Sequence, residues 1–107
     1  MKILTIGDIV SQTGRKMVFE VLELLAPKMD FIIANCENAA HGKGLTKPVY
    51  EELCRSGIDM FTLGNHTWGC PDVAKVLEYN DNIIRPANFE GDCPGCGSAV
   101  LVSRNGV

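Results

Sequence analysis

Apolar residues along the chain gather in short continuous runs that stop at glycines or polar clusters. Runs of β-branched and aromatic residues bounded in this way are typical of buried strands. We therefore expect strands over residues 2–6, 31–34, 59–63, 83–84 and 98–103. Because these runs are continuous rather than strictly alternating, they indicate a sheet that is buried on both faces.

The segments between these runs carry helical periodicity. After Gly14, apolar residues recur on a single helical face, and Pro27 closes that stretch. Thr46 is a good N-cap for the next helix, and Gly57 follows that helix as a stop signal. The pattern predicts three helices: between Gly14 and Pro27, over residues 48–56, and from Pro71 to about Glu78.

Strands and helices therefore alternate along the chain, which indicates right-handed βαβ units. The predicted fold class is α/β, with a mainly parallel sheet covered by helices on both faces. At 107 residues, of which 46% are hydrophobic, the chain has the length of one domain, over residues 1–107. Asn105–Gly106 is a type I′ hairpin signal that a return strand should follow. Only Val107 remains after it, so we expect a truncated domain.

Charge and hydropathy exclude several classes of partner. The net charge is −3 and the basic residues are scattered, so we expect no surface for DNA, RNA or an anionic membrane. Asp8 interrupts the first apolar stretch, and no apolar run approaches the roughly 18 residues of a membrane span. The five cysteines cannot all pair within the chain, which favours free thiols and a cytoplasmic protein.

Polar pairs follow three of the predicted strands at the points where the strands end. These pairs are Gly7–Asp8, Glu37–Asn38 and Asn65–His66. Because the carboxyl ends of parallel strands share one edge of a sheet, we expect the three pairs to converge there. Carboxylate and amide oxygens with one imidazole suit Mn²⁺, Fe²⁺ or Mg²⁺ better than structural zinc. The pattern therefore predicts a divalent-metal site, with His66 placed to act as a general acid.

Four motifs resemble the YmdB-like branch of the calcineurin-type metallophosphoesterases. They are Gly7–Asp8, NCENAAHGKGLT over residues 35–46, GNHTW over 64–68 and RPANF over 85–89. Their order and spacing match that branch from the first strand to about residue 89. The resemblance implies the N-terminal half of a metallophosphoesterase sandwich, and a cytosolic phosphodiesterase with two divalent ions, Fe or Mn. It also implies small phosphodiester substrates such as 2′,3′-cyclic nucleotides or cyclic nucleotides of other kinds.

The same resemblance assigns roles to five residues. Asp8 and Asn38 would bind the first metal ion, and Asn65 would bind the second. Glu37 would bridge the two ions, and His66 would donate a proton to the leaving group. The activity implied for the complete fold is in-line hydrolysis of the phosphodiester.

Two departures from the family pattern leave a second interpretation open. Val10 stands where the wider superfamily has a histidine, which Asn38 replaces in this branch. The chain contains only His41 and His66, whereas the family supplies further metal-binding histidines from its second half. In this second interpretation, the chain is a catalytically incomplete fragment, or a regulatory module that binds a nucleotide or a partner. A third interpretation is a flavodoxin-like electron carrier, suggested only by the alternation of strands and helices and by the Cys93–Cys96 pair. The sequence also leaves open whether the protein forms a homo-oligomer.

Overall fold

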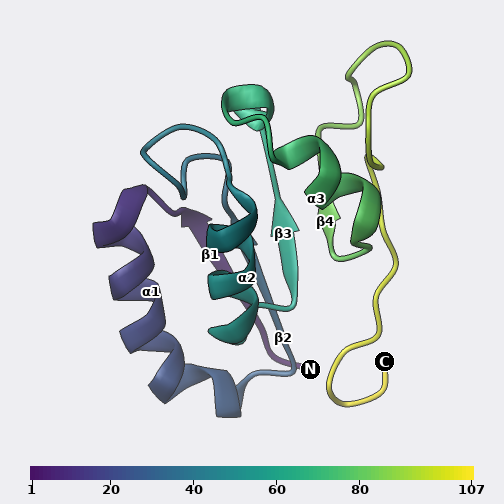
Figure 1. Cartoon of the computed structure of the whole chain (residues 1–107). Helices are drawn as coiled ribbons and strands as arrows, with labels where there is room; N and C mark the ends of the chain where they lie inside the picture. The colour runs from purple at the N-terminus through teal and green to yellow at the C-terminus, as the bar shows by residue number, and fades with distance from the viewer.

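Four parallel strands form one sheet in the order β1-β2-β3-β4 (Figure 1). The computed structural model describes the whole chain, residues 1–107. The strands are β1 (Ile3–Asp8), β2 (Phe31–Asn35), β3 (Met60–Thr62) and β4 (Ile83–Ile84). The helices are α1 (Ser11–Leu25), α2 (Lys47–Arg55) and α3 (Val73–Tyr79), with 3₁₀ helices η1 (Ala26–Lys28) and η2 (Thr67–Gly69). The predicted α/β fold class, with its parallel sheet, is confirmed.

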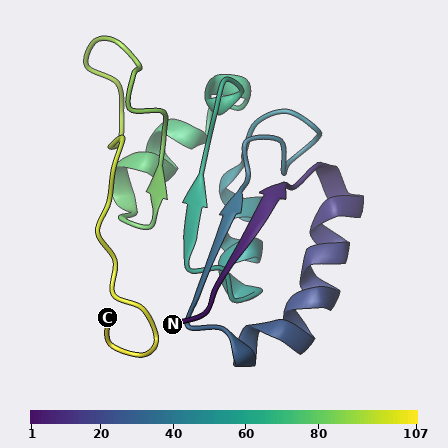
Figure 2. The same cartoon turned by 180° about the vertical axis from the view of Figure 1, so that it is seen from behind.

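All three α-helices cover one face of this sheet, so the expectation that helices cover both faces is wrong. Figures 1 and 2 show the helices on one side of the strands and no helix on the other. Each right-handed crossover moves the chain by one strand in the same direction, which places every connecting helix on the same face. Helices cover both faces where the strand order reverses, and a local hydrophobic pattern does not encode that order.

The core lies between the sheet and the helices. Along β2, Ile32 and Ala34 are fully buried, whereas Phe31 and Ile33 alternate with them and are only half-buried. Each helix contributes a buried leucine: Leu22 of α1, Leu53 of α2 and Leu77 of α3. This core holds the strands, and therefore the loops that follow them, in fixed positions relative to one another.

Replacing Ile32 by valine should lower the free energy of unfolding by about 0.5–1.5 kcal/mol, because the lost methyl group leaves a gap in a close-packed core. Ile32 is 0% exposed on a central strand. Ile3→Val makes the same chemical change at a side chain that is 52% exposed, and should change stability by less than about 0.5 kcal/mol. Urea unfolding measures both variants, and equal losses would contradict the described core.

The bounds of α1 and α2 show what a periodicity pattern detects. α1 begins at Ser11, ahead of the predicted start after Gly14. Periodicity does not detect this start, because the first turn is polar and the apolar periodicity begins only at Met17. Thr46 caps α2 as predicted, and its hydroxyl accepts a hydrogen bond from the Val49 N–H at 3.4 Å. A cap signal therefore locates a helix start that hydrophobic spacing alone misses.

Residues 98–103 do not form the predicted fifth strand. The segment runs past β4 without a backbone ladder (Figure 2), and Val100 is 98% exposed. A run of strand-forming residues becomes a strand only where it pairs with a neighbouring strand, and β4 is just two residues long. The sheet therefore ends at β4.

The chain ends in a turn, but not in the predicted type I′ turn at Asn105–Gly106. Gly106 has a φ of +87°, whereas Asn105 does not have a positive φ, and a type I′ turn needs both. The bonded turn runs from Ser103 to Gly106, whose N–H donates to the Ser103 carbonyl at 2.9 Å. Arg104 fastens this turn beside the start of β3 through an ion pair with Asp59 at 3.0 Å.

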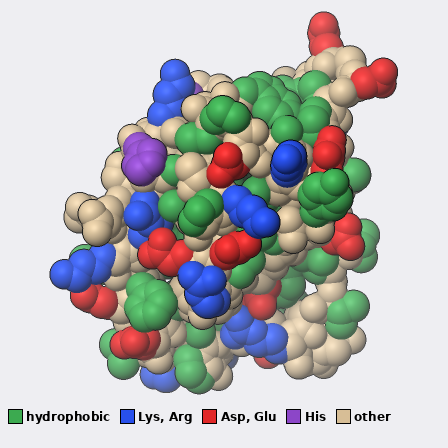
Figure 3. Space-filling view, in the orientation of Figure 1, with side chains coloured by type: hydrophobic (Ala, Val, Ile, Leu, Met, Phe, Trp, Pro, Cys, Tyr) green, Lys and Arg blue, Asp and Glu red, His purple; other side chains and the backbone are tan.

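The helical face of the molecule carries charges of both signs. Figure 3 shows Lys and Arg side chains interspersed with Asp and Glu side chains over this face. Lys47 and Glu51 on α2 are an example, with their charged groups 4.0 Å apart. None of the helices has the length and apolar character needed to cross a membrane.

Candidate functional site

The loops that follow β1, β2 and β3 meet at one edge of the sheet, as predicted (Figure 1). Main-chain hydrogen bonds join them where the strands end. The Ile9 N–H donates to the Asn35 carbonyl at 3.2 Å, and the Cys36 N–H donates to the Thr62 carbonyl at 3.0 Å. The parallel sheet thus brings together side chains that are about thirty residues apart in the sequence.

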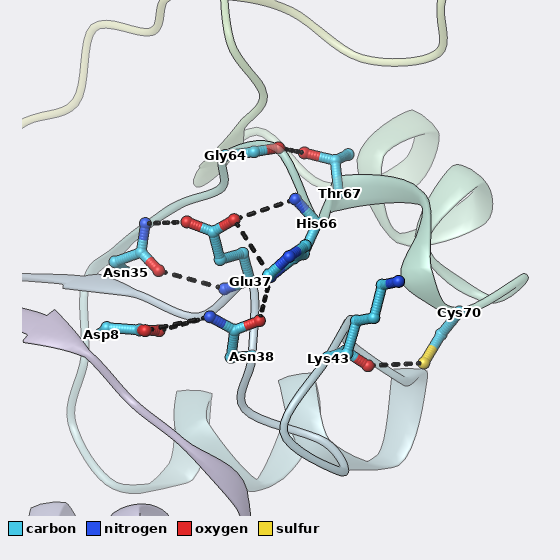
Figure 4. A network of polar contacts seen from close by, with 9 residues as sticks. All are labelled: Asp8, Asn35, Glu37, Asn38, Lys43, Gly64, His66, Thr67 and Cys70. Atoms are coloured by element: carbon cyan, nitrogen blue, oxygen red, sulfur yellow. Dashed lines mark hydrogen bonds and ion pairs between the residues drawn. The ribbon is translucent and has the colours of Figure 1, made fainter.

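Asn38 is the centre of the polar network at this edge (Figure 4). Its amide nitrogen lies 3.0 Å from both carboxylate oxygens of Asp8, and its amide oxygen lies 2.5 Å from Nδ1 of His66. Because an ionised carboxylate only accepts hydrogen bonds, the amide nitrogen must face Asp8 and the amide oxygen must face His66. Nδ1 of His66 therefore carries a hydrogen and donates a hydrogen bond to the Asn38 amide oxygen, which leaves Nε2 free of this contact.

Glu37 is held on both of its carboxylate oxygens. Oε1 accepts a hydrogen bond from the side-chain amide of Asn35 at 3.3 Å, and Oε2 accepts one from the backbone N–H of His66 at 2.9 Å. The Glu37 side chain is only 14% exposed. Gly64 lies against the carboxylate, and a Cβ at that position would come within 2.7 Å of Glu37 Cδ. Gly64, which opens the GNHTWG segment (residues 64–69), therefore makes room for Glu37.

The GNHTWG segment forms a tight turn that leads into η2. The hydroxyl of buried Thr67 donates to the Gly64 carbonyl at 2.6 Å and closes the turn around His66. Gly69 packs so closely against Gly44 that a Cβ on Gly44 would lie 2.8 Å from the Gly69 carbonyl carbon. Gly44 also has a φ of +88°, which favours glycine. The loops after β2 and β3 therefore fit together through their glycines.

Two residues to which the sequence pattern assigned no role support the loop after β2. Arg15 of α1 donates through Nη1 to the carbonyls of Ala39 and Ala40, at 2.5 and 2.8 Å. Its Nε lies 3.3 Å from a carboxylate oxygen of Glu52 on α2. The second residue is Asn35, whose side chain hydrogen-bonds to Glu37. Asn35 belongs to one of the four motifs, which is a signal for it, whereas the polar start of α1 around Arg15 contains no such motif.

The structure joins four of the five predicted site residues. Hydrogen bonds link Asp8, Asn38 and His66, and the backbone of His66 links Glu37 to them. Asn65 lies on the exposed turn next to His66 and makes none of these side-chain hydrogen bonds. The roles of these residues in binding metal or donating a proton remain predictions.

Two buried groups behind the site keep their protons. Burial raises the pKa of the Cys36 thiol, and the neighbouring Cys54 and Glu37 raise it further. Burial also raises the pKa of the Tyr50 hydroxyl, as does Cys54, while the hydrogen bond to Asn82 opposes the shift. Because a thiolate rather than a thiol binds metal, Cys36 serves here as a small core residue.

The RPANF motif lies outside the polar network. Phe89 packs against Trp68, which is 46% exposed, with the ring centroids 6.0 Å apart. The Arg85 guanidinium donates to the carbonyls of Pro94 and Gly95 at 3.2 and 3.3 Å. The motif therefore supports the loops beside the site.

All five cysteines of the chain are free thiols, as predicted.

The donor set at this edge suits a divalent metal ion. Asp8 and Glu37 offer carboxylate oxygens, and Asn38 and Asn65 offer amide oxygens. Hard divalent ions prefer such oxygen ligands. No three histidine, cysteine or carboxylate side chains lie close enough to form a ligand cluster. The close approach of Gly64 to Glu37 also shows that one carboxylate has a dedicated space.

The fold and the site together define the chain as a parallel α/β domain with an oxygen-rich polar cluster at the carboxyl edge of its sheet. The sequence profile of YmdB-like proteins matches residues 4–107, and the chain belongs to this family. The resemblance indicated by the four motifs is therefore confirmed.

Relatives and solved structures support this placement. A 2′,3′-cyclic-nucleotide 2′-phosphodiesterase of Bacillus subtilis (strain 168) is 46% identical over 99% of this chain and 40% of its own length. The crystal structure of a hypothetical protein from Thermus thermophilus matches with a TM-score of 0.86 and 39% identity, over 91% of this chain and 38% of that chain. A phosphatase from Mycoplasma pneumoniae matches with a TM-score of 0.79 and 36% identity, over 84% and 33%. The chain spans at most 40% of the length of these relatives.

Proposed function

We propose that the protein is a metal-dependent phosphodiesterase and that this chain supplies one side of its active site. The observation that carries the proposal is the network in which Asn38 hydrogen-bonds to both Asp8 and His66, while the Glu37 carboxylate accepts a hydrogen bond from the His66 backbone N–H. Phosphodiester hydrolysis needs stabilisation of charge on the phosphoryl group and protonation of the leaving oxygen. Divalent ions held by the clustered carboxylates would meet the first requirement, and the oriented imidazole would meet the second.

The substrate class we propose is the 2′,3′-cyclic nucleotides. The Bacillus subtilis relative, which matches along almost the whole of this chain, is a 2′,3′-cyclic-nucleotide 2′-phosphodiesterase. The Mycoplasma pneumoniae neighbour is a phosphatase, so hydrolysis of phosphoesters is common to both names. The strained cyclic phosphodiester of such nucleotides is small enough to approach the side chains at the carboxyl edge of the sheet.

Four residues would hold two divalent ions, Fe or Mn, at this site. Asp8 and Glu37 would supply negative charge, and the amide oxygens of Asn38 and Asn65 would add neutral donors. When bound, such ions polarise the phosphoryl oxygens and lower the pKa of a bound water. The hydrogen bonds from Asn35 and from the His66 backbone hold the Glu37 carboxylate at the strand edge.

His66 is the residue that we propose as the proton donor. The Asn38 amide oxygen accepts a hydrogen bond from Nδ1–H, which fixes the tautomer and orientation of the ring and leaves Nε2 to carry the transferred proton. Asp8 acts through Asn38, because it accepts hydrogen bonds from the amide nitrogen and so holds the amide oxygen toward His66. The His66 side chain is 36% exposed, so a substrate can approach it from solvent.

The test is hydrolysis of 2′,3′-cyclic AMP by the purified protein, with Mn²⁺ and with the chelator EDTA. We expect release of a nucleoside monophosphate with Mn²⁺ and its loss with EDTA, because without a cation the carboxylates repel the negatively charged phosphodiester. Hydrolysis that persists in EDTA would contradict the proposed metal dependence. Binding of Mn²⁺ without hydrolysis would favour the alternative, a catalytically incomplete module that binds a nucleotide or a partner.

A further inference from the structure

Asn35 makes two side-chain hydrogen bonds to one residue, and no metal-binding role accounts for them. Asn35 is the last residue of β2, where its backbone pairs in register with Asp8 of β1 and Thr62 of β3. Its Oδ1 accepts the Glu37 N–H at 3.2 Å, and its Nδ2 donates to Glu37 Oε1 at 3.3 Å. The side chain of Asn35, at the end of an inner strand, therefore holds both the backbone and the carboxylate of Glu37.

The Glu37 carboxylate is thus oriented by a donor on each oxygen. Oε1 faces the Asn35 amide, and Oε2 faces the His66 backbone N–H at 2.9 Å. Gly64 leaves the space that this orientation needs. A free glutamate samples several rotamers, and a ligand that requires one of them must first select it. Donors on both oxygens make that selection before any ligand arrives.

We propose that Asn35 is a positioning residue that presets the Glu37 carboxylate for a divalent ion and couples β2 to the turn that carries His66. The identity of the ligand rests on the proposed function, whereas the orientation of Glu37 does not. Removing the hydrogen-bonding partner of a metal ligand typically lowers metal affinity by about 10–100-fold. Among the proposed ligands, the Asn35 side chain hydrogen-bonds to Glu37 alone, so the effect of changing this side chain should be transmitted through Glu37.

Two variants separate the two hydrogen bonds. Asn35→Ala removes both, whereas Asn35→Asp keeps an acceptor for the Glu37 N–H and replaces the donor by a second negative charge. In the metal-free protein, hydrogen exchange measured by NMR should accelerate about tenfold or more at the His66 N–H in both variants, because its acceptor is displaced. Exchange at the Glu37 N–H should accelerate only in Asn35→Ala. In calorimetric titration with Mn²⁺, Asn35→Ala should bind about 10–100-fold more weakly.

Asn80→Ala is the matched control. The Asn80 side chain donates to the Val76 carbonyl at 2.8 Å at the end of α3, so this variant should leave the exchange and the Mn²⁺ affinity unchanged. Unchanged His66 exchange in both Asn35 variants would overturn the proposal, whether or not Mn²⁺ binds. Accelerated exchange with undiminished Mn²⁺ affinity would overturn the role of Asn35 toward the metal. Accelerated exchange in a protein whose wild type binds no Mn²⁺ would support the positioning of Glu37 and contradict the proposed function.

Discussion

Replacing Glu37 by glutamine is expected to remove Mn²⁺ binding and phosphodiesterase activity together. Glutamine keeps the size of the side chain but loses the negative charge, and Asp8 is then the only carboxylate left in the network. The amide of glutamine would also present a donor to one of the two N–H groups that now face carboxylate oxygens, so the preset orientation is lost. We expect Mn²⁺ affinity to fall by more than the roughly 100-fold upper range for loss of an outer partner. Calorimetric titration with Mn²⁺ and the cyclic-nucleotide assay measure the two losses.

Glu51→Gln is the control for this substitution. Glu51 lies on α2, where its carboxylate is 4.0 Å from the Lys47 ammonium at the surface. Exposed ion pairs of this kind contribute little to stability, so Glu51→Gln should keep both Mn²⁺ binding and activity. If Glu37→Gln retained the Mn²⁺ affinity of the wild type, Glu37 would not be a metal ligand.

His66→Ala is expected to keep Mn²⁺ bound and to lower the rate of hydrolysis by roughly 10²–10⁴-fold, the usual contribution of a general acid. The substitution removes the imidazole but leaves the backbone N–H that holds Glu37 Oε2. Metal binding and rate should therefore separate, unlike in Glu37→Gln. Steady-state kinetics on 2′,3′-cyclic AMP, with metal content measured on the same samples, show whether they do.

His41→Ala provides the comparison, because His41 and His66 are the only histidines of the chain. His41 is exposed on the loop after β2 and makes no side-chain hydrogen bond to the polar network. Its replacement should leave kcat close to that of the wild type. Loss of metal together with activity in His66→Ala would show that His66 is a metal ligand instead of a proton donor.

The convergence of the site residues could be predicted from the sequence because it requires only that the strands are parallel, which the alternation of strands and helices indicates. Asp8 ends β1, Glu37 and His66 follow β2 and β3, and parallel strands present their carboxyl ends at one edge. The contacts within the site could not be predicted in the same way. Which oxygen of Glu37 faces Asn35, and which end of the Asn38 amide faces His66, depend on side-chain orientation in three dimensions.

The fold was predictable to a similar depth. Apolar runs and capping signals located the four strands and three helices, since these depend on local sequence. The number of covered faces depends on the order of strands in the sheet, which no local run records. Residues 98–103 have a strand-like composition, but a strand also needs a partner, and pairing is a property of the whole fold.

The measurement that tests the central claim most directly is the metal content of the purified protein, determined by elemental mass spectrometry beside Glu37→Gln. The proposed function predicts about two Fe or Mn ions per chain in the wild type, and none in the variant. Wild-type protein that remains free of metal after incubation with Mn²⁺, or a variant that retains the same content as the wild type, would contradict the claim that Asp8, Glu37 and their amide neighbours form a metal centre.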